Sequence, residues 1–229
     1  MTLTPQLFAA CRDVVAYKAI IDRAVHYRSQ LSGVLPRAKR VSVCPLVYAK
    51  CVFPFYNVDN QSDEGIHAVP SDAVIGSTYK HFEPTTRAKL ELLNATSPCG
   101  LSRAWYYQIG TLPIYFAYEG KNRVQAYQSH NLEITCDLWA SSYPSVESLS
   151  IHAVKGCPGH YVLHCRDEFF VGSELSVAPL CFPNVSIPVL RAYGVKMGED
   201  YNQIVDRSDI TKPKTPSQAT YWLLNYLNS

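Results

Sequence analysis

The stretch that decides the fold is residues 113–139, PIYFAYEGKNRVQAYQSHNLEITCDLW. Its first six residues are rich in aromatic side chains, which predicts a strand over residues 113–118. A turn at residues 119–122 and a short helix at residues 123–130 follow, and residues 132–139 alternate between apolar and polar side chains as a second strand does. We therefore expect an α+β protein built around a strand, turn, helix and strand.

The turn Glu119-Gly120-Lys121-Asn122-Arg123 has residue types that suit a bound phosphate. Glycine lets the backbone approach a ligand closely. Lys121, Asn122 and Arg123 stand at the start of the predicted helix, whose free N–H groups favour an anion. The chain has no Gly-x-x-x-x-Gly-Lys-Ser/Thr sequence, so this is not a Walker A loop. An ordinary surface turn uses the same residue types, and the residues alone leave that alternative open.

The strand, the Gly120-x-x-Arg123 turn, the helix and the second strand together resemble the ParB/sulfiredoxin superfamily, whose members carry a Gly-x-x-Arg turn between strand and helix. The resemblance covers residues 41–139, and Lys121 and Asn122 occupy the variable positions of the turn. It implies a mixed sheet with flanking helices, here with extra N-terminal and C-terminal helices, and a turn that binds nucleotide or nucleic-acid phosphate. Lys121 stands where sulfiredoxin has cysteine, and the helix-turn-helix of chromosome-partition ParB is absent, so neither thiol chemistry nor centromere recognition is expected.

Without that cysteine and without a helix-turn-helix, the sequence looks more like the plasmid fertility-inhibition group that includes Osa and FiwA. This resemblance implies an ATPase and a nuclease (DNase), encoded on a plasmid, that inhibits conjugative or T-DNA transfer through a type IV secretion system. Glu119 and Arg123 are then the catalytic candidates. Gly120, Lys121, Asn122 and Arg123 are the candidates for binding the phosphate of ATP or DNA.

Phosphoryl transfer also needs carboxylates that hold a divalent cation such as Mg²⁺ or position a water. Glu119 stands beside the turn, and Asp59, Asp63 and Glu64 lie in what we expect to be a polar loop over residues 57–65. A solvated surface turn would use the same residues as this loop, so that alternative also stays open.

Two alternatives to an enzyme remain. The 16 Tyr and 3 Trp residues suit a non-catalytic protein that docks on a partner such as a conjugation coupling ATPase, because aromatic residues are enriched at binding hot spots. A sequence-tolerant DNA binder would instead use a basic N-terminal helix whose outer face carries Arg12, Lys18, Arg23 and Arg28, although a solvated helix face has the same pattern. The net charge of +2 provides no strong overall field, so any DNA contact must be local.

The remaining expectations concern the organisation of the chain. Residues 1–229 are expected to form a single domain, with a basic helix and linker over residues 1–40, a mixed α/β core over residues 41–200 and a helix over residues 210–229. The start of the chain lacks a secretory pattern and no segment has the ~18 uninterrupted apolar residues of a membrane span, so we expect a cytoplasmic protein. Within the core we expect short edge strands over residues 41–55, helices over residues 84–94 and 97–108, strands over residues 161–165 and 169–171, and an extended segment over residues 185–193.

The eight cysteines are scattered singly, and most are expected to be buried free thiols. Cys157, His160 and His164 have the ligand types of a zinc site, and alternation along a strand would put the two histidines on one face. A fourth ligand is not evident at standard spacing, and a strand with hydrogen-bonded histidines is the alternative.

Overall fold

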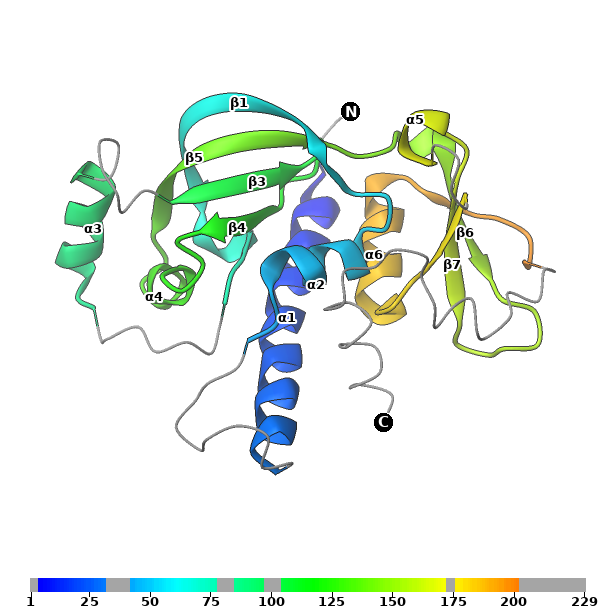
Figure 1. Cartoon of the computed structure of the whole chain (residues 1–229), viewed down its shortest axis with the longest axis horizontal. Helices are drawn as coiled ribbons and strands as arrows, with labels where there is room; N and C mark the ends of the chain where they lie inside the picture. Colours follow the sequence, from blue (N-terminus) through cyan, green and yellow to red (C-terminus); the bar gives the residue numbers. More distant parts are fainter. Residues whose placement is uncertain (1–3, 32–41, 78–84, 97–103, 172–175, 202–229) are drawn as a thin grey trace. The chain divides into compact units, whose positions relative to one another are not determined.

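The structure is a computed structural model that describes residues 4–31, 42–77, 85–96, 104–171 and 176–201, with only the backbone described for residues 28–31 and 59. It combines helices with two β-sheets, which confirms the α+β class (Figure 1). The predicted C-terminal helix over residues 210–229 lies outside the described residues.

The elements, in chain order, are α1 (Pro5–Leu31), α2 (Pro45–Val52), β1 (Asn57–Pro70), η1 (Ser71–Ala73), β2 (Val74–Ile75), α3 (Arg87–Thr96), β3 (Trp105–Ile109), β4 (Tyr115–Glu119), α4 (Val124–Ser129), β5 (Glu133–Ser142), η3 (Val146–Ser148), β6 (Leu149–Ala153), β7 (Tyr161–Cys165), α5 (Glu168–Val171), β8 (Val177–Pro179), α6 (Pro183–Tyr193) and β9 (Lys196–Met197).

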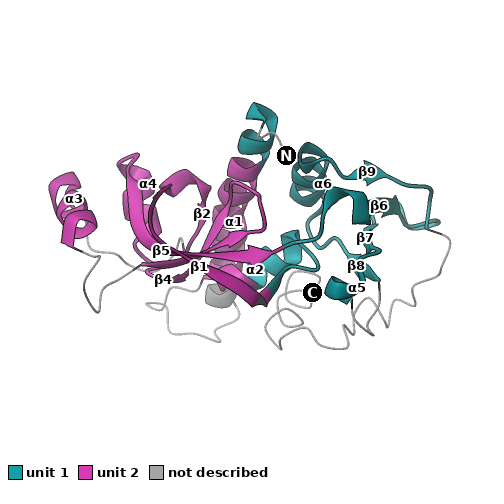
Figure 2. Ribbon diagram, turned by 90° about the horizontal axis from the view of Figure 1, so that it is seen from above, with its two compact units in different colours: residues 1–10, 47–57, 143–229 teal, residues 11–46, 58–142 magenta. Residues whose placement is uncertain are grey.

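The chain divides into two compact units that alternate along the sequence (Figure 2). The first unit takes its described residues from 1–10, 47–57 and 143–229, and the second from 11–46 and 58–142. The chain therefore passes from one unit to the other at four places. Whether the two units act as the single domain expected from the sequence stays a prediction.

The second unit contains a mixed five-stranded sheet in the order β1-β5-β3-β4-β2. Strands β3 and β4 run antiparallel, while β3 pairs with β5 and β4 pairs with β2 in parallel. Helices α3 and α4 cover one face of this sheet (Figure 1). Leu90 from α3 and Val124 and Tyr127 from α4 are buried there against Tyr106 and Ala117 of the strands. The predicted strand, turn, helix and strand around Gly120 is thus present as β4, α4 and β5.

The first unit contains a four-stranded sheet in the order β8-β7-β6-β9 and the helix α6. Strand β7 confirms the strand predicted over residues 161–165. Strands β6 and β7 pair antiparallel, and β9 adds to β6 in parallel.

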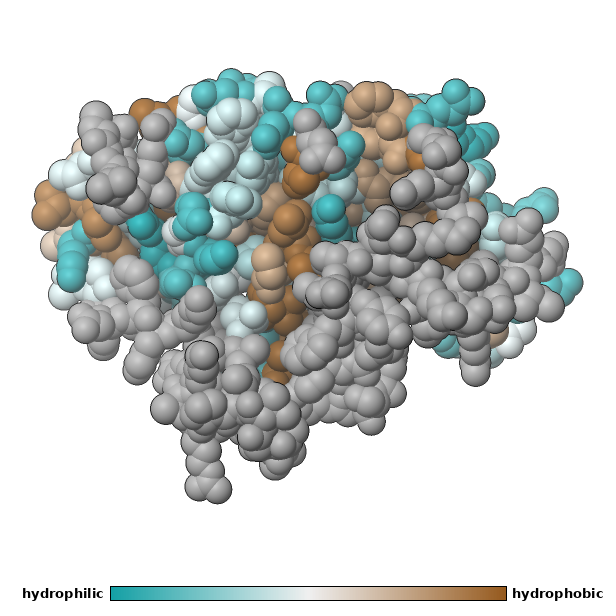
Figure 3. Space-filling model, viewed as in Figure 1, coloured by the Kyte–Doolittle hydropathy of each residue, from teal (hydrophilic) through white to brown (hydrophobic). Residues whose placement is uncertain are grey.

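Helix α1 confirms the predicted N-terminal helix, and the hydroxyl of Thr4 accepts a hydrogen bond from the backbone N–H of Leu7 at 3.2 Å. The expected basic outer face is only partly correct. Lys18 is completely buried, whereas the hydrophobic side chain of Ile20 is 58% exposed. Figure 3 shows hydrophobic residues along α1 on this side of the molecule.

Three segments expected to be extended are helices. Residues 45–52 form α2 in place of edge strands, because Pro45 suits a first helical turn and the buried side chains of Val47, Tyr48, Cys51 and Val52 hide the helical period. Residues 168–171 form the short helix α5, which begins where the carboxylate of Asp167 accepts a hydrogen bond from the backbone N–H of Phe169 at 3.1 Å. Residues 183–193 form α6, which begins at Pro183 and ends at Gly194 with a left-handed φ of 117°.

Two other segments, predicted to be a loop and the end of a helix, are strands. The polar loop predicted over residues 57–65 is part of the long edge strand β1, since ladder hydrogen bonds with β5 do not require apolar side chains and edge strands are often polar. Residues 105–108, predicted to end a helix, belong to β3, where their aromatic side chains suit the pleated surface. The helix predicted over residues 84–94 is confirmed in its described part by α3.

Candidate functional site

The Gly120 turn lies between the end of β4 and the start of α4, in the order predicted. Gly120 has a φ of 74°, a left-handed conformation that favours glycine. The backbone N–H of Arg123 donates to the carbonyl oxygen of Gly120 at 3.0 Å and closes the turn. The carbonyl oxygen of Lys121 accepts a hydrogen bond from Ser77 at 2.9 Å, which ties the turn to the segment after β2.

Glycines let two stretches of backbone pack closely around this turn. A Cβ atom on Gly120 would lie 3.3 Å from Ala104 and 3.3 Å from Nε of Arg123. A Cβ atom on Gly76 would lie 2.6 Å from the Cβ of Val124, at the first residue of α4. The turn is therefore held on two sides by neighbouring backbone.

Arg123 lies close to two phenol groups of the core. Tyr106 is completely buried, and its hydroxyl has no hydrogen-bond partner within the described part of the chain. The hydroxyl of Tyr127 donates to the carbonyl oxygen of Leu90 at 3.1 Å. Burial raises the pKa of both tyrosines, and the positive charge of Arg123 opposes this rise. The guanidinium group thus places a positive charge near the buried hydroxyl of Tyr106.

The other residues of the turn differ in exposure. Glu119 is exposed, whereas Lys121, Asn122 and Arg123 are half-buried. The buried Oδ1 atom of Asn122 has no hydrogen-bond partner among the residues described. Arg123 is the N-cap of α4 and makes no side-chain capping bond. The turn therefore offers two cationic side chains and an uncapped helix start, a combination that attracts anions.

The structure does not group the other candidate carboxylates with this turn. Asp63 accepts a hydrogen bond from the backbone of Gly65 at 2.8 Å, and Glu64 accepts one from Ser62 at 2.7 Å, so both side chains make local bonds. Both residues lie on β1, and the sheet order puts β5 and β3 between β1 and β4. The side chain of Asp59 lies outside the described residues.

The three zinc-ligand candidates lie in the other unit. Cys157 is half-buried, and His160 is exposed in the turn before β7. His164 lies on β7, and its ring is 6.0 Å from that of His152, measured between centroids. In the described ranges no three or more His, Cys, Asp or Glu side chains come together in a way that could hold a metal ion.

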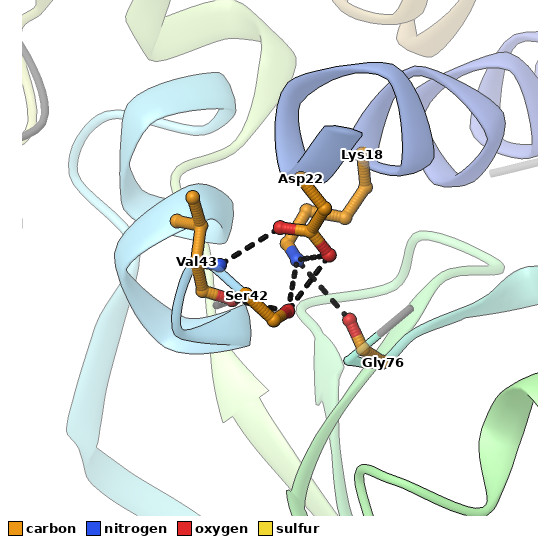
Figure 4. Close-up of polar contacts among 5 residues, drawn as sticks. All are labelled: Lys18, Asp22, Ser42, Val43 and Gly76. Atoms are coloured by element: carbon orange, nitrogen blue, oxygen red, sulfur yellow. Dashed lines mark hydrogen bonds and ion pairs between the residues drawn. The ribbon is translucent and has the colours of Figure 1, made fainter. Parts of the chain in front are cut away.

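Sequence reasoning missed a buried polar network that Figure 4 shows beside α1. The ammonium group of Lys18 lies 2.6 Å from Oδ2 of Asp22 and 3.3 Å from the carbonyl oxygen of Gly76. Asp22 also accepts hydrogen bonds from the hydroxyl of Ser42 at 2.7 Å and from the backbone N–H of Val43 at 2.8 Å. A lysine and an aspartate four residues apart on a helix are the signal that could have indicated this pair.

Burial lowers the pKa of Lys18, and the nearby carboxylate of Asp22 opposes that change. The network reaches the Gly120 turn through two consecutive residues. Gly76 accepts a hydrogen bond from Lys18, and the next residue, Ser77, donates to the carbonyl oxygen of Lys121. Helix α1 therefore supports the backbone on which the turn rests.

A cluster of aromatic rings also involves strands β3, β4 and β5. The ring centroid of Trp105 lies 5.1 Å from that of Tyr118, 5.7 Å from that of Trp139 and 6.0 Å from that of Tyr107. Tyr118 is 47% exposed, and Trp105 and Trp139 are half-buried. Tyr118 lies two residues before Gly120, so the cluster is adjacent to the turn along the strand.

Across the ranges that the structure describes, no helix is both long and apolar enough to span a membrane. Comparisons with protein-family models, curated proteins and solved structures found no match to this chain.

Proposed function

We propose that the Gly120–Arg123 turn binds the phosphate of a nucleotide or nucleic acid, in a protein of the ParB/sulfiredoxin fold that hydrolyses ATP, DNA or both. The observation that carries the proposal is the placement of half-buried Lys121 and Arg123 on one glycine turn before the uncapped start of α4. Two cations on a braced backbone are already positioned to neutralise phosphate charge.

The residues of the turn then have distinct roles. Lys121 and Arg123 bind phosphate oxygens, and Gly120 allows the positive φ and the close packing against Ala104 that fix the turn. The exposed carboxylate of Glu119 orients a water or holds Mg²⁺, which would supply charge neutralisation at the transferred phosphate. The fit of Glu119 to this role rests on its oxygen ligands and its place beside the turn.

In the cell, we propose a cytoplasmic, plasmid-encoded inhibitor of conjugative or T-DNA transfer through a type IV secretion system. This part of the proposal rests on the resemblance of the turn and its flanking strands to the fertility-inhibition group. Hydrolysis of ATP or of the transferred DNA would be the means of inhibition.

The decisive experiment compares Arg123→Ala with Arg12→Ala. Arg12 forms an exposed ion pair with Asp72 at 2.7 Å and is in the same unit, so its loss controls for removing one positive charge. We expect Arg123→Ala to lose at least about 100-fold in ATP or DNA hydrolysis with Mg²⁺, while Arg12→Ala keeps parental rates. A folded Arg123→Ala protein that hydrolyses ATP and nicks DNA at the parental rate would contradict the proposal.

A second candidate function is a non-catalytic protein that docks on a conjugation coupling ATPase through the aromatic cluster. The exposed ring of Tyr118 between Trp105 and Tyr107 favours it, because clustered aromatic residues are frequent hot spots. Tyr118→Ala should then weaken binding to the purified ATPase. Unchanged binding by this variant, together with hydrolysis by the isolated parent protein, would argue against docking.

A further inference from the structure

One face of the sheet in the first unit gathers a serine and two histidines. Ser150 and His152 are two residues apart on β6, so their side chains lie on the same face, and Ser150 is directly opposite His164 on β7. All three are half-buried. On the opposite face of the two strands, Leu149, Ile151, Leu163 and Cys165 are buried.

The hydrogen bonds of His152 determine which of its ring nitrogens carries the proton. Its Nδ1 atom lies 2.6 Å from the carbonyl oxygen of Glu199, which can only accept, so Nδ1 is the protonated nitrogen. In the neutral ring Nε2 is then an acceptor. The hydroxyl of Ser150 lies 2.8 Å from Nε2 and donates its proton to it. This order of hydroxyl, imidazole and orienting oxygen is that of an activated serine nucleophile.

The ring of His152 is also held in place by the segment after β9. A Cβ atom on Gly198 would lie 2.3 Å from Cε1 of His152, so the backbone at Gly198 packs directly against the ring. The N–H of Gly198 donates to Ile151 at 2.7 Å and that of Tyr201 to Ala153 at 2.8 Å, which fastens the segment to β6. A base fixed in this way needs no rearrangement before it accepts a proton.

Each strand beside β6 carries a residue in register with Ser150. His164, opposite Ser150, lines a cavity of about 220 Å³ together with Arg166, Glu168 and Val171. The described residues that line this cavity do not include Ser150 or His152. On the other side of β6, the exposed residue Lys196 is the register partner of Ser150. A carbonyl group at Ser150 would therefore lie between a strand that borders a cavity and a strand that carries a cation.

We propose that Ser150 and His152 form a nucleophile and general base for acyl transfer, with carboxylic esters as the substrate class. The Oγ atom of Ser150 forms a bond to the ester carbonyl carbon while its proton passes to Nε2 of His152. The bond to the alcohol oxygen then breaks, and the alcohol leaves with the proton from His152. Water, deprotonated by the same nitrogen, releases the carboxylic acid and restores the serine.

This inference is separate from the proposed function. The dyad lies in the first unit and the Gly120 turn in the second, and neither argument uses the residues of the other. A protein that lacks one of the two activities can therefore still be tested for the other.

The test uses the full chain and a fluorophosphonate probe, with peptide mass spectrometry to locate the modified residue. In this reaction the serine oxygen bonds to phosphorus, the P–F bond breaks, and the proton leaves with fluoride. We expect modification at Ser150, and loss of at least about 100-fold in its rate in His152→Gln, which lacks the imidazole base. Ser148→Ala is the matched control, because the hydroxyl of Ser148 hydrogen-bonds the backbone carbonyl oxygen of Ser145 at 2.8 Å and the thiol of Cys165, and neither partner is an imidazole base. The proposal is overturned if the parent protein is not modified at Ser150, or if His152→Gln is modified there as fast as the parent.

Gly198→Ala tests the position of the base without changing either dyad residue. The added methyl group must displace the ring of His152, so we expect slower modification of Ser150. In the double variant His152→Ala/Gly198→Ala the contact no longer exists, and the loss of thermal stability caused by Gly198→Ala should be relieved. If Gly198→Ala folds and Ser150 reacts at the parental rate, the placement of His152 has no catalytic meaning and the dyad is rejected.

Discussion

The ammonium nitrogen of Lys18 lies 2.6 Å from Oδ2 of Asp22, and both residues are completely buried. Removing two charges from water is costly, and in this network the cost is offset by mutual attraction and by hydrogen bonds from Ser42 and Val43 to Asp22. Breaking such a pair is far more harmful than never having formed it, because one charge is then left without its partner. The first prediction follows from this asymmetry.

Asp22→Asn should destabilise the protein by about 3–5 kcal/mol, since it leaves the buried ammonium group of Lys18 without a carboxylate. Glu91→Gln is the control, because Arg87 and Glu91 form an ion pair with the same spacing on α3 but with exposed side chains. Its loss should be about 0.5 kcal/mol or less. Urea unfolding followed by far-UV circular dichroism measures both. Equal losses in the two variants would show that burial of the Lys18 pair does not matter.

Gly120→Ala should be more harmful than Gly65→Ala. Both glycines have a positive φ, at 74° and 81°, so alanine is strained at either position. Only at Gly120 does the new Cβ atom also meet neighbours, at 3.3 Å from Ala104, whereas nothing lies within 4 Å of a Cβ atom on Gly65. We expect an additional loss of about 1 kcal/mol for Gly120→Ala in urea unfolding, together with weaker nucleotide binding. The prediction is wrong if the two variants unfold at the same urea concentration.

The stability of the protein should fall as the pH drops below 6.5, in part because of His164. Burial lowers the pKa of His164 from its ordinary value of 6.5, and the neighbouring His152 and Arg166 lower it further. The unfolded chain therefore binds a proton at this position at a higher pH than the folded chain does. The contribution of His164 to the free energy of unfolding is therefore fully present above pH 6.5. It is lost as the pH falls through 6.5 toward the pKa of His164 in the folded protein.

Urea midpoints at two pH values on either side of this window measure the effect. The parent protein should lose more stability between them than His164→Asn does. A pH dependence that His164→Asn leaves unchanged would assign the effect to other groups.

The described cysteines of the second unit, Cys11, Cys44 and Cys136, should react with iodoacetamide in an order set by burial. Cys44 is exposed and should be alkylated first. Burial raises the pKa of Cys11 to about 12 and that of Cys136 to about 12, so almost no thiolate is present at pH 8 and access is blocked as well. Pulse alkylation with mass spectrometry measures the order, and urea should abolish the differences. Early modification of Cys11 or Cys136 in the folded protein would contradict this packing.

The parts of the fold that the sequence predicted correctly are those with strong local signals. The strand, turn and helix around Gly120 follow from an apolar run, a glycine and a polar turn in close succession, and α1 follows from its cap at Thr4 and its helical period. Helices α2 and α6 were missed because β-branched and aromatic residues fill their buried sides, where packing outweighs intrinsic propensity. Strand β1 was missed because its polar residues show no alternation.

The candidate sites likewise differ in whether their residues are close together in the sequence. The Gly120 turn is contiguous in sequence, so its residues could be selected together. The Lys18 network joins α1 to residues 42, 43 and 76, and the dyad at His152 is completed by the backbone of Glu199. Such partners are far apart along the chain. Every residue has a backbone carbonyl oxygen, so the residue type does not reveal which one accepts a hydrogen bond.

The alternation of the chain between its two units limits how the protein can be dissected. No single cut yields either unit as one uninterrupted polypeptide, because residues 1–10 and 47–57 of the first unit are separated by residues 11–46 of the second. A truncation after residue 142 would keep the Gly120 turn but leave two orphan pieces of the first unit attached to it. Fragment complementation, in which separately produced segments reassemble, is therefore the appropriate way to isolate the contributions of the two units, and conventional domain deletion is not.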